Sequence, residues 1–212
     1  KRENLFITSK LLLDNADYYT IQSMCEQSLA RLQTHYLDQY LIHWPNKNAD
    51  YDEVIHSFST LYKKNKIKSF GVSNFTITHL DKILPLTKKY NIPLTVNQVE
   101  FHPFLNQNKL LEFCRRNNIV IVAYCPLAQG KVFQNKLLQE IGKKYNKTAG
   151  QISLRWLIQK NLIVIPKASS ESHLKENMDI FNFSLTKEEM EKIDAIQEHL
   201  RIINPLFSEF DD

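Results

Sequence analysis

Apolar residues occur in six short, nearly continuous runs separated by longer stretches of mixed character. Runs of this length are typical of strands that are buried on both faces of a parallel sheet. The pattern predicts six strands, which are Leu5–Lys10, Leu37–Trp44, Ile67–Ser73, Thr95–Glu100, Ile119–Pro126 and Leu162–Ala168.

Between these runs, apolar residues recur at helical spacing. The predicted helices are Tyr18–Leu32, Tyr51–Asn65, Ile77–Tyr90, Asn108–Asn117, Lys136–Tyr145, Thr148–Gln159 and a last one that ends near Glu198. Thr148 is expected to be an N-cap, and Thr186 with Glu189 forms a capping-box pattern that opens the last helix. Strands that alternate with helices indicate βαβ units and a parallel sheet. No low-complexity linker interrupts the pattern, so residues 1–212 are expected to form a single domain.

Most of the predicted strands end in a polar side chain. These strand-end residues are Lys10, His43, Ser73, Asn74, Gln98, Glu100, Tyr124 and Lys167. An open doubly wound sheet would accommodate six strands, but polar endings on successive strands favour a barrel, where they meet at one rim. A lysine and a histidine delivered to one rim suggest proton-transfer chemistry.

Composition excludes several classes of protein. A net charge of +4 comes without a basic stripe that carries aromatic residues, so nucleic-acid binding is not expected. Three cysteines without CxxC spacing argue against a zinc site and for a reducing compartment, so a cytoplasmic location and no metal are expected. No apolar run is long enough to span a bilayer. Neither a GxGxxG turn nor a P-loop is present.

Six short motifs in this order resemble those of the aldo-keto reductases, in particular the bacterial branch that resembles 2,5-diketogluconate reductase. They are Ile7–Lys10, Leu37–Pro45, Gly71–Phe75, Val96–Glu100, Ala123–Leu127 and Ile165–Ser170. The resemblance runs along essentially the whole chain. It implies an α/β fold, the (β/α)8 TIM barrel, with strands 3–8 represented and the first two βα units absent from this chain.

The same resemblance implies an oxidoreductase that uses NADPH to transfer a hydride to an aldehyde or ketone, giving an alcohol. The family's catalytic set is Asp, Tyr, Lys and His. Lys10 and His43 match the Lys and the His, whereas the Asp and the Tyr belong upstream of the Ile7–Lys10 strand. Tyr18 and Tyr19 follow Lys10 at the start of a helix and cannot take the tyrosine's role.

The tyrosine hydroxyl would be the acid in this chemistry, and a nearby ammonium favours its charged form. That is the role implied for Lys10, and a structural ion pair at the rim is the alternative. His43 would orient the substrate carbonyl from a neutral or a charged imidazole. Trp44 would line the substrate pocket, or would simply pack at the rim.

The resemblance also implies a set of cofactor-binding residues. They are Ser73, Asn74, Gln98, Tyr124, Cys125, Pro126, Leu127, Lys167, Ser169, Ser170, His173, Glu176 and Asn177. Tyr124 would stack on the nicotinamide or pack in the core, and Ser169 and Ser170 would bind phosphate or cap a helix. Cys125 stands where the family commonly has Ser, and His173 where many members have Arg. NADPH is therefore expected, with NADH possible.

His35, His56, His79 and His199 are interpreted as surface residues. Three hypotheses remain open: a truncated form of a working reductase, a non-catalytic or regulatory cofactor-binding barrel, and an inactive partial barrel that another chain completes. The expected partner is a small carbonyl substrate. The full-length protein is expected to be a monomer, whereas the 212-residue chain is expected to aggregate or oligomerise through unpaired strand edges at Leu5–Lys10 and Leu162–Ala168.

Overall fold

The computed structural model describes residues 1–14 and 17–210. Contacts divide the chain into two compact units. Unit 1 is defined by residues 1–98, 113–119 and 207–212, and unit 2 by residues 99–112 and 120–206. Strand β4 (Leu94–Glu100) and helix α4 (Asn108–Arg116) contribute residues to both units.

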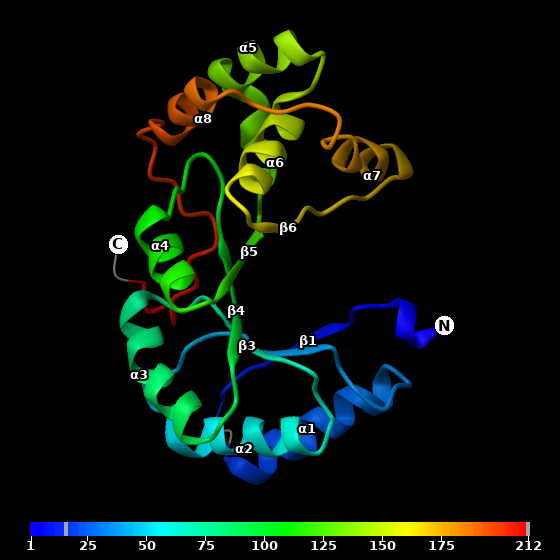
Figure 1. Ribbon diagram of the computed structural model, residues 1–212, viewed down its shortest axis with the longest axis vertical. Coiled ribbons are helices and arrows are strands. Elements are labelled where there is room, and N and C mark those ends of the chain that lie inside the picture. The colour runs from blue at the N-terminus through cyan, green and yellow to red at the C-terminus, as the bar shows by residue number, and fades with distance from the viewer. Residues whose placement is uncertain (15–16, 211–212) are drawn as a thin grey trace. The chain divides into compact units, whose positions relative to one another are not determined.

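Unit 1 is built from parallel strands and the helices that follow them. In chain order, its further elements are η1 (Arg2–Asn4, a 3-10 helix), β1 (Thr8–Leu11), α1 (Tyr18–Arg31), β2 (Gln39–Ile42), α2 (Tyr51–Lys63), β3 (Phe70–Ser73) and α3 (Ile77–Lys89). β1 pairs in parallel with β2, β2 with β3, and β3 with β4. Helix α1 packs on α2, and α2 packs on α3 (Figure 1).

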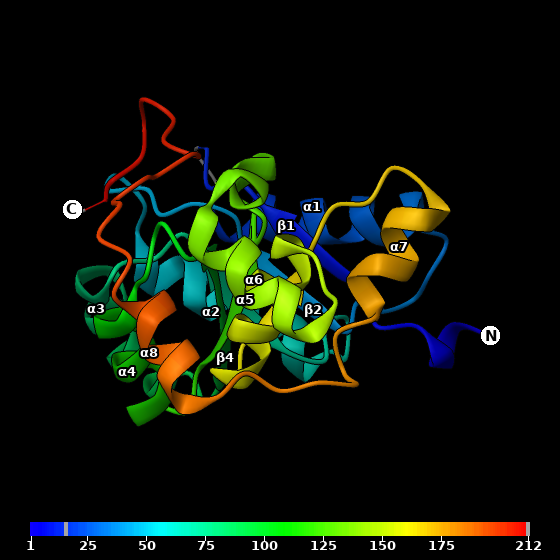
Figure 2. The same ribbon diagram turned by 90° about the horizontal axis from the view of Figure 1, so that it is seen from above.

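Unit 2 continues the same alternation. It comprises β5 (Val120–Tyr124), η2 (Ala128–Gln134, a 3-10 helix), α5 (Lys136–Tyr145), α6 (Ala149–Gln159), β6 (Ile163–Ile165), α7 (Glu171–Met178) and α8 (Lys187–Asp194). β5 and β6 pair in parallel. Helices α5 and α6 lie against each other, as Figure 2 shows. The strands of the sheet follow one another in chain order, β1 to β6, which agrees with the predicted succession of βα units.

Side chains that cap the helices explain where most of them begin. Thr76, Thr148 and Thr186 each accept a hydrogen bond from the main-chain N–H three residues later, in a capping box, and Thr148 and Thr186 were predicted in this role. A cap of this kind contributes about 1 kcal/mol. The last helix stops at Asp194, so the expectation that it reaches Glu198 was wrong.

The core of unit 1 forms where large side chains of β2 and β3 meet those of α2. The rings of Tyr40 and Phe58 lie 5.3 Å apart, and those of Phe58 and Phe70 lie 4.7 Å apart. Gly71 allows the strands to approach, because a Cβ atom there would lie 2.6 Å from Leu41 Cδ2 and 2.9 Å from the Val96 carbonyl oxygen. The strand ends that carry polar residues are therefore held by a tightly packed sheet.

Two sequence expectations need correction. His79 is 7% exposed and is not a surface residue, because its Nδ1 accepts the Thr76 N–H and its Nε2 lies 3.4 Å from Glu209. Strand β6 was expected to be buried on both faces, yet Ile163 and Ile165 are 51% and 45% exposed. β6 is also an edge strand in the described sheet.

Candidate functional site

Parallel pairing brings several predicted site residues of unit 1 to one edge of its sheet. Lys10 is paired with Leu41, and the His43 main-chain N–H donates a 2.8 Å hydrogen bond to the Leu11 carbonyl. Ser73 is paired with Gln98 on β4. Because neighbouring parallel strands end at the same edge, Lys10, His43, Ser73 and Gln98 all lie at the carboxyl end of this sheet.

Burial makes this edge a poor place for positive charge. Partial burial of its ammonium lowers the pKa of Lys10, although much of its side chain remains exposed. Burial, together with the positive charge of Lys10, lowers the pKa of His43 below its usual value. The lowered pKa favours the neutral imidazole at pH 7, which is one of the two forms that the sequence left open. Among the described residues, no carboxylate forms an ion pair with Lys10, so the alternative of a structural ion pair is not supported there.

Trp44 is only 8% exposed, because the segment 207–210 of unit 1 packs against it. The Trp44 ring meets those of Phe207 and Phe210 edge-on, at centroid distances of 5.4 and 5.7 Å. Glu209 of the same segment accepts the Lys47 main-chain N–H at 2.9 Å. These contacts give Trp44 a packing role, and its contact with substrate stays a prediction.

Ser73, Asn74 and Gln98 form a buried polar group. Ser73 Oγ donates to the Gln98 carbonyl at 2.8 Å, and Asn74 Nδ2 donates to the His43 carbonyl at 3.0 Å and to Ser73 Oγ at 3.2 Å. Gln98 Oε1 is buried and has no hydrogen-bond partner among the described residues. A buried acceptor without a donor is costly for stability, so it suits a ligand that brings an N–H, such as a carboxamide.

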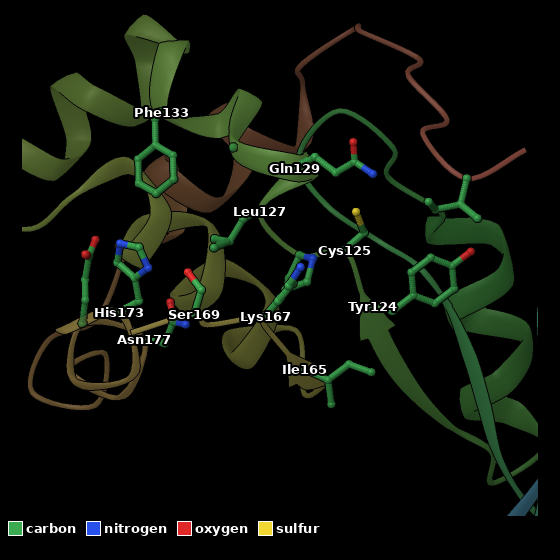
Figure 3. Close-up of a pocket in the computed structure, with 14 residues that line it drawn as sticks. Tyr124, Cys125, Leu127, Gln129, Phe133, Ile165, Lys167, Ser169, His173 and Asn177 are labelled. Atoms are coloured by element: carbon green, nitrogen blue, oxygen red, sulfur yellow. The ribbon is translucent and has the colours of Figure 1, made fainter. Parts of the chain in front are cut away.

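A cavity of about 630 Å³ lies within unit 2. Its volume falls in the range that small-molecule and cofactor sites occupy. The predicted cofactor-binding residues among those that line it are Tyr124, Cys125, Pro126, Leu127, Lys167, Ser169, His173, Glu176 and Asn177. Figure 3 shows Tyr124 at one end and His173 at the other, with Leu127 between them. Residues from the ends of β5 and β6 and from α7 thus surround one space.

The loop after β5 holds an unusual backbone on one side of this cavity. Cys125, Ala128 and Gln129 have φ angles of 54°, 47° and 51°, and Gly130 has φ 90°. The left-handed region is unfavourable for residues that carry a Cβ atom. Strained backbone of this kind concentrates at functional sites, and here four left-handed residues border the cavity or directly precede residues that do.

Helix α7 supplies the opposite side of the cavity. Ser170 is its N-cap, and Ser170 Oγ accepts the His173 main-chain N–H at 3.2 Å. Ser170 does not line the cavity, so the capping alternative describes its observed contact. Glu176 Oε1 accepts a hydrogen bond from Thr148 Oγ1 at 2.6 Å, which ties α7 to the start of α6. Lys167 and the first turn of α7 together make a suitable place for an anion.

Cys125 is a poor nucleophile in this setting. Its side chain is half-buried, and burial raises the pKa of the thiol, with a further increase from the negative charge of Glu100. Only the thiolate is reactive. The raised pKa therefore keeps Cys125 in its unreactive thiol form.

Sequence reasoning missed several residues of the cavity wall. They are Gln129, Gly130, Phe133, Ile165 and Ile203. Phe133 and Ile165 are 43% and 45% exposed, and large apolar side chains that stay exposed around a cavity mark a binding site. Gly130 was the available sequence signal, because the chain has only four glycines and this one lies three residues after the motif Ala123–Leu127.

The geometry agrees with the comparisons to known proteins. The model of the aldo/keto reductase family matches residues 1–198. The chain belongs to the aldo/keto reductase family. Its relatives include the glyoxal reductase of Bacillus subtilis (strain 168), 44% identical over 95% of this chain and 71% of that protein. The methylglyoxal reductase DkgA of Yersinia pestis is 41% identical over 89% of this chain and 68% of its own length.

Solved structures of the family superpose closely on this chain. A crystal structure provisionally described as a 2,5-diketo-D-gluconic acid reductase B gives a TM-score of 0.93 with 35% identity, covering 100% of this chain and 75% of that one. The aldose reductase of Schistosoma japonicum gives 0.91 with 30% identity, over 98% and 74%. The predicted family is confirmed, and six successive strands in a barrel-type α/β fold are confirmed with it. The numbering of these strands as 3–8 stays a prediction.

Family membership identifies an oxidoreductase, and members of this family generally use nicotinamide cofactors. Within residues 1–14 and 17–210, no group of three or more His, Cys, Asp or Glu side chains is arranged to hold a metal ion. In the same part of the chain, no helix combines the length and apolar character that crossing a membrane requires.

Proposed function

We propose that this protein is an NADPH-dependent carbonyl reductase that transfers a hydride to an aldehyde or ketone. The observation that carries the proposal is the cavity of unit 2, because most of the residues that the family resemblance assigns to the cofactor line it. The named reductases of glyoxal and methylglyoxal among the relatives support a small aldehyde as the substrate.

The cofactor is proposed to lie along this cavity. Its adenosine phosphates would meet Lys167, Ser169 and the N-terminus of α7, where a cation and main-chain N–H groups favour anions. His173 would be the contact that reads the 2′-phosphate. Tyr124 offers an aromatic face to the flat nicotinamide. NADPH supplies the hydride when it is bound.

The chain's own contribution to the chemistry would come from Lys10 and His43. A neutral His43 can hydrogen-bond the substrate carbonyl oxygen and orient it without protonating it. The ammonium of Lys10 would stabilise the charged form of an acid phenol. Tyr18 Oη donates to Thr60 Oγ1 at 3.1 Å and Tyr19 is 79% exposed, so neither is proposed as that phenol. We propose that the tyrosine and its aspartate are supplied from outside residues 1–212.

A non-catalytic cofactor-binding barrel, or a partial barrel completed by another chain, is the second candidate. The exposed apolar residues of the edge strand β6 favour it.

We also propose a cytoplasmic location for the protein. The free thiols of Cys25, Cys114 and Cys125 support this proposal, because free cysteines persist in reducing compartments.

The test measures NADPH binding by fluorescence and NADPH oxidation with methylglyoxal. The 212-residue chain is compared with a fusion that carries the N-terminal segment of the Bacillus subtilis glyoxal reductase. The proposal expects NADPH binding by both proteins and turnover only by the fusion. Binding without turnover in either protein would favour the non-catalytic alternative, and turnover by the unfused chain would refute an outside acid.

A further inference from the structure

The carboxylate of Glu100 is buried at the end of β4 and accepts three hydrogen bonds in unit 2. His102 Nε2 and the Ile202 main-chain N–H meet Oε1, and the Ile203 main-chain N–H meets Oε2, each at 2.8 Å. Gln107 Nε2 also donates to the Glu100 main-chain carbonyl at 2.6 Å. Burial alone would raise the pKa of Glu100, but the hydrogen bonds from His102 and the two N–H groups lower it. The carboxylate is therefore ionised.

These bonds hold a segment that has no regular structure of its own. Residues 200–203 belong to no helix or strand, and their first residue is fixed by the Leu200 main-chain N–H, which donates to the Phe104 carbonyl at 2.8 Å. The main-chain N–H groups of Ile202 and Ile203 both donate to the Glu100 carboxylate. We call residues 200–203 the strap.

The strap reaches the cavity through one side chain. Ile203 lines the same cavity as Tyr124, Cys125 and Lys167. The position of the Ile203 side chain is set by its backbone, and that backbone is held by the Glu100 carboxylate. The fully buried Glu100 carboxylate at the end of β4 is thus connected to the wall of the cavity through Ile203.

His102 supports this arrangement at a cost. Its ring is fully buried, Nε2 faces the ionised Glu100, and Nδ1 is buried without a hydrogen-bond partner among the described residues. An ionised acceptor requires a hydrogen on Nε2, and Nδ1 takes no part in this contact. A buried charged group with an unsatisfied neighbour is a poor way to gain stability. The pair is better explained by what it positions.

We propose that Glu100 is a positioning residue of the binding cavity, which holds the strap so that Ile203 completes the cavity wall and raises its affinity for the cofactor. The ligand in this inference is the NADPH of the proposed function, on which the inference rests. The role of Glu100 in holding the strap depends only on the contacts above.

The test is Glu100→Gln, which keeps the shape but places an NH2 group opposite one of the three donors. Amide exchange at Ile202 and Ile203 and tryptic cleavage after Arg201 should each become about tenfold faster, and the NADPH dissociation constant should rise about tenfold. Ile203→Ala should weaken NADPH binding by a similar factor. The double variant should bind no more weakly than either single one, because both act through one contact. Glu140→Gln, on the exposed surface of α5, is the control.

The outcomes separate the inference from the function on which it rests. Unchanged exchange and cleavage in Glu100→Gln would overturn the anchoring role. Faster exchange with unchanged NADPH affinity would overturn the positioning role while leaving the proposed function intact. Failure of the wild-type protein to bind NADPH would overturn the proposed cofactor and the claim about affinity together. If Glu100→Gln does not fold, Ile203→Ala decides, because full affinity in that variant overturns the proposal.

Discussion

The side-chain amide of Asn74 donates a 3.0 Å hydrogen bond to the main-chain carbonyl of His43. Asn74 lies in the left-handed region, at φ 64°, and is 3% exposed. The residue after β3 therefore fixes the backbone after β2, where the proposed carbonyl-orienting imidazole is attached. This contact gives Asn74 a role that requires no ligand.

Two replacements of Asn74 should separate the contribution of its side-chain amide to stability from that of its left-handed backbone conformation. Asn74→Gly keeps the φ angle and removes the amide, which takes this donor away from the part-buried His43 carbonyl and should cost about 0.5–1.5 kcal/mol. Asn74→Ala should cost about 1 kcal/mol more because of its Cβ atom. Urea unfolding measures both. Asn118→Gly, at an exposed left-handed position, should be nearly neutral, and an equally neutral Asn74→Gly would contradict the role.

Lys10→Met should separate catalysis from binding in the fusion protein described above. If the ammonium acts on the acid in the transition state, turnover should fall by about 10²–10⁴-fold while the NADPH dissociation constant changes little. Steady-state kinetics and fluorescence titration measure the two effects. Lys64→Met, at the exposed end of α2, is the matched control. An altered dissociation constant with unchanged turnover would refute the assigned role.

His173→Arg should increase the preference for NADPH over NADH. Arginine offers a fixed fork of donors to a phosphate, whereas histidine offers a single ring nitrogen to it, so the ratio of the two dissociation constants should rise by about tenfold. The wild-type ratio should already favour NADPH modestly. Lys175→Ala, on α7 but outside the cavity lining, should leave the ratio unchanged. Equal effects of His173→Arg on both cofactors would show that the 2′-phosphate does not meet this position.

Glu189 should make the stability of the protein sensitive to acid. Burial alone would raise its pKa, but Tyr145 Oη, the Thr186 N–H and the Lys144 ammonium lower it to about 2. A carboxylate with a depressed pKa in the folded state stabilises the fold above the ordinary value of 4.5, and this contribution is lost as the pH falls towards 2. Glu189→Gln should reduce the free energy of unfolding by about 1–3 kcal/mol at pH 7 and flatten its dependence on pH in that window.

The control for that measurement is the adjacent residue. Glu188 forms an ion pair with Lys192 on the exposed face of α8, where solvent screens the charges, so Glu188→Gln should change the free energy of unfolding much less than Glu189→Gln. Urea unfolding at pH 7 and at pH 4 supplies the comparison. Equal losses from the two variants would contradict a special role for the buried carboxylate.

The exposed edge of β6 should promote self-association of the 212-residue chain. Exposed apolar strands template pairing with other chains, and Ile163 on β6 is 51% exposed. Light scattering should therefore show oligomers or aggregates, and Ile163→Lys should reduce them. Leu174→Lys, an exposed apolar position on a helix, tests whether hydrophobicity alone is responsible. A monodisperse monomer that unfolds cooperatively would contradict this expectation.

Helices with a strong apolar stripe could be predicted from the sequence almost residue by residue. Lys136–Tyr145 was predicted with both of its ends, because Leu138 and Ile141 mark its buried face. Helix α7 was not delimited, since none of its residues is buried and its sequence carries no stripe; only Ser170 as a possible cap pointed to it. Periodicity detects a helix through the core that it faces, and α7 faces the cavity instead.

Site residues that belong to short local motifs could be predicted from the sequence, whereas contacts between distant positions could not. Lys10 and His43 follow apolar strands, which is a local signal, and the structure places both at the carboxyl end of their sheet. Ile203 and Glu100 could not be linked, because their contact joins positions more than a hundred residues apart and the strap has neither periodicity nor a cap. The same reason explains His79, whose partner Glu209 lies near the opposite end of the sequence.

The left-handed backbone of the loop after β5 restricts which residue types its positions can tolerate during evolution. Valine, isoleucine and threonine are the residues least tolerated at positive φ, whereas glycine and asparagine are accepted. Positions 125, 128 and 129 should therefore exclude β-branched residues in a randomised library, even when selection acts on folding alone. The residue types recovered there under selection for folding would reflect the backbone geometry. Any residue types lost only under selection for turnover would reflect a requirement of the ligand.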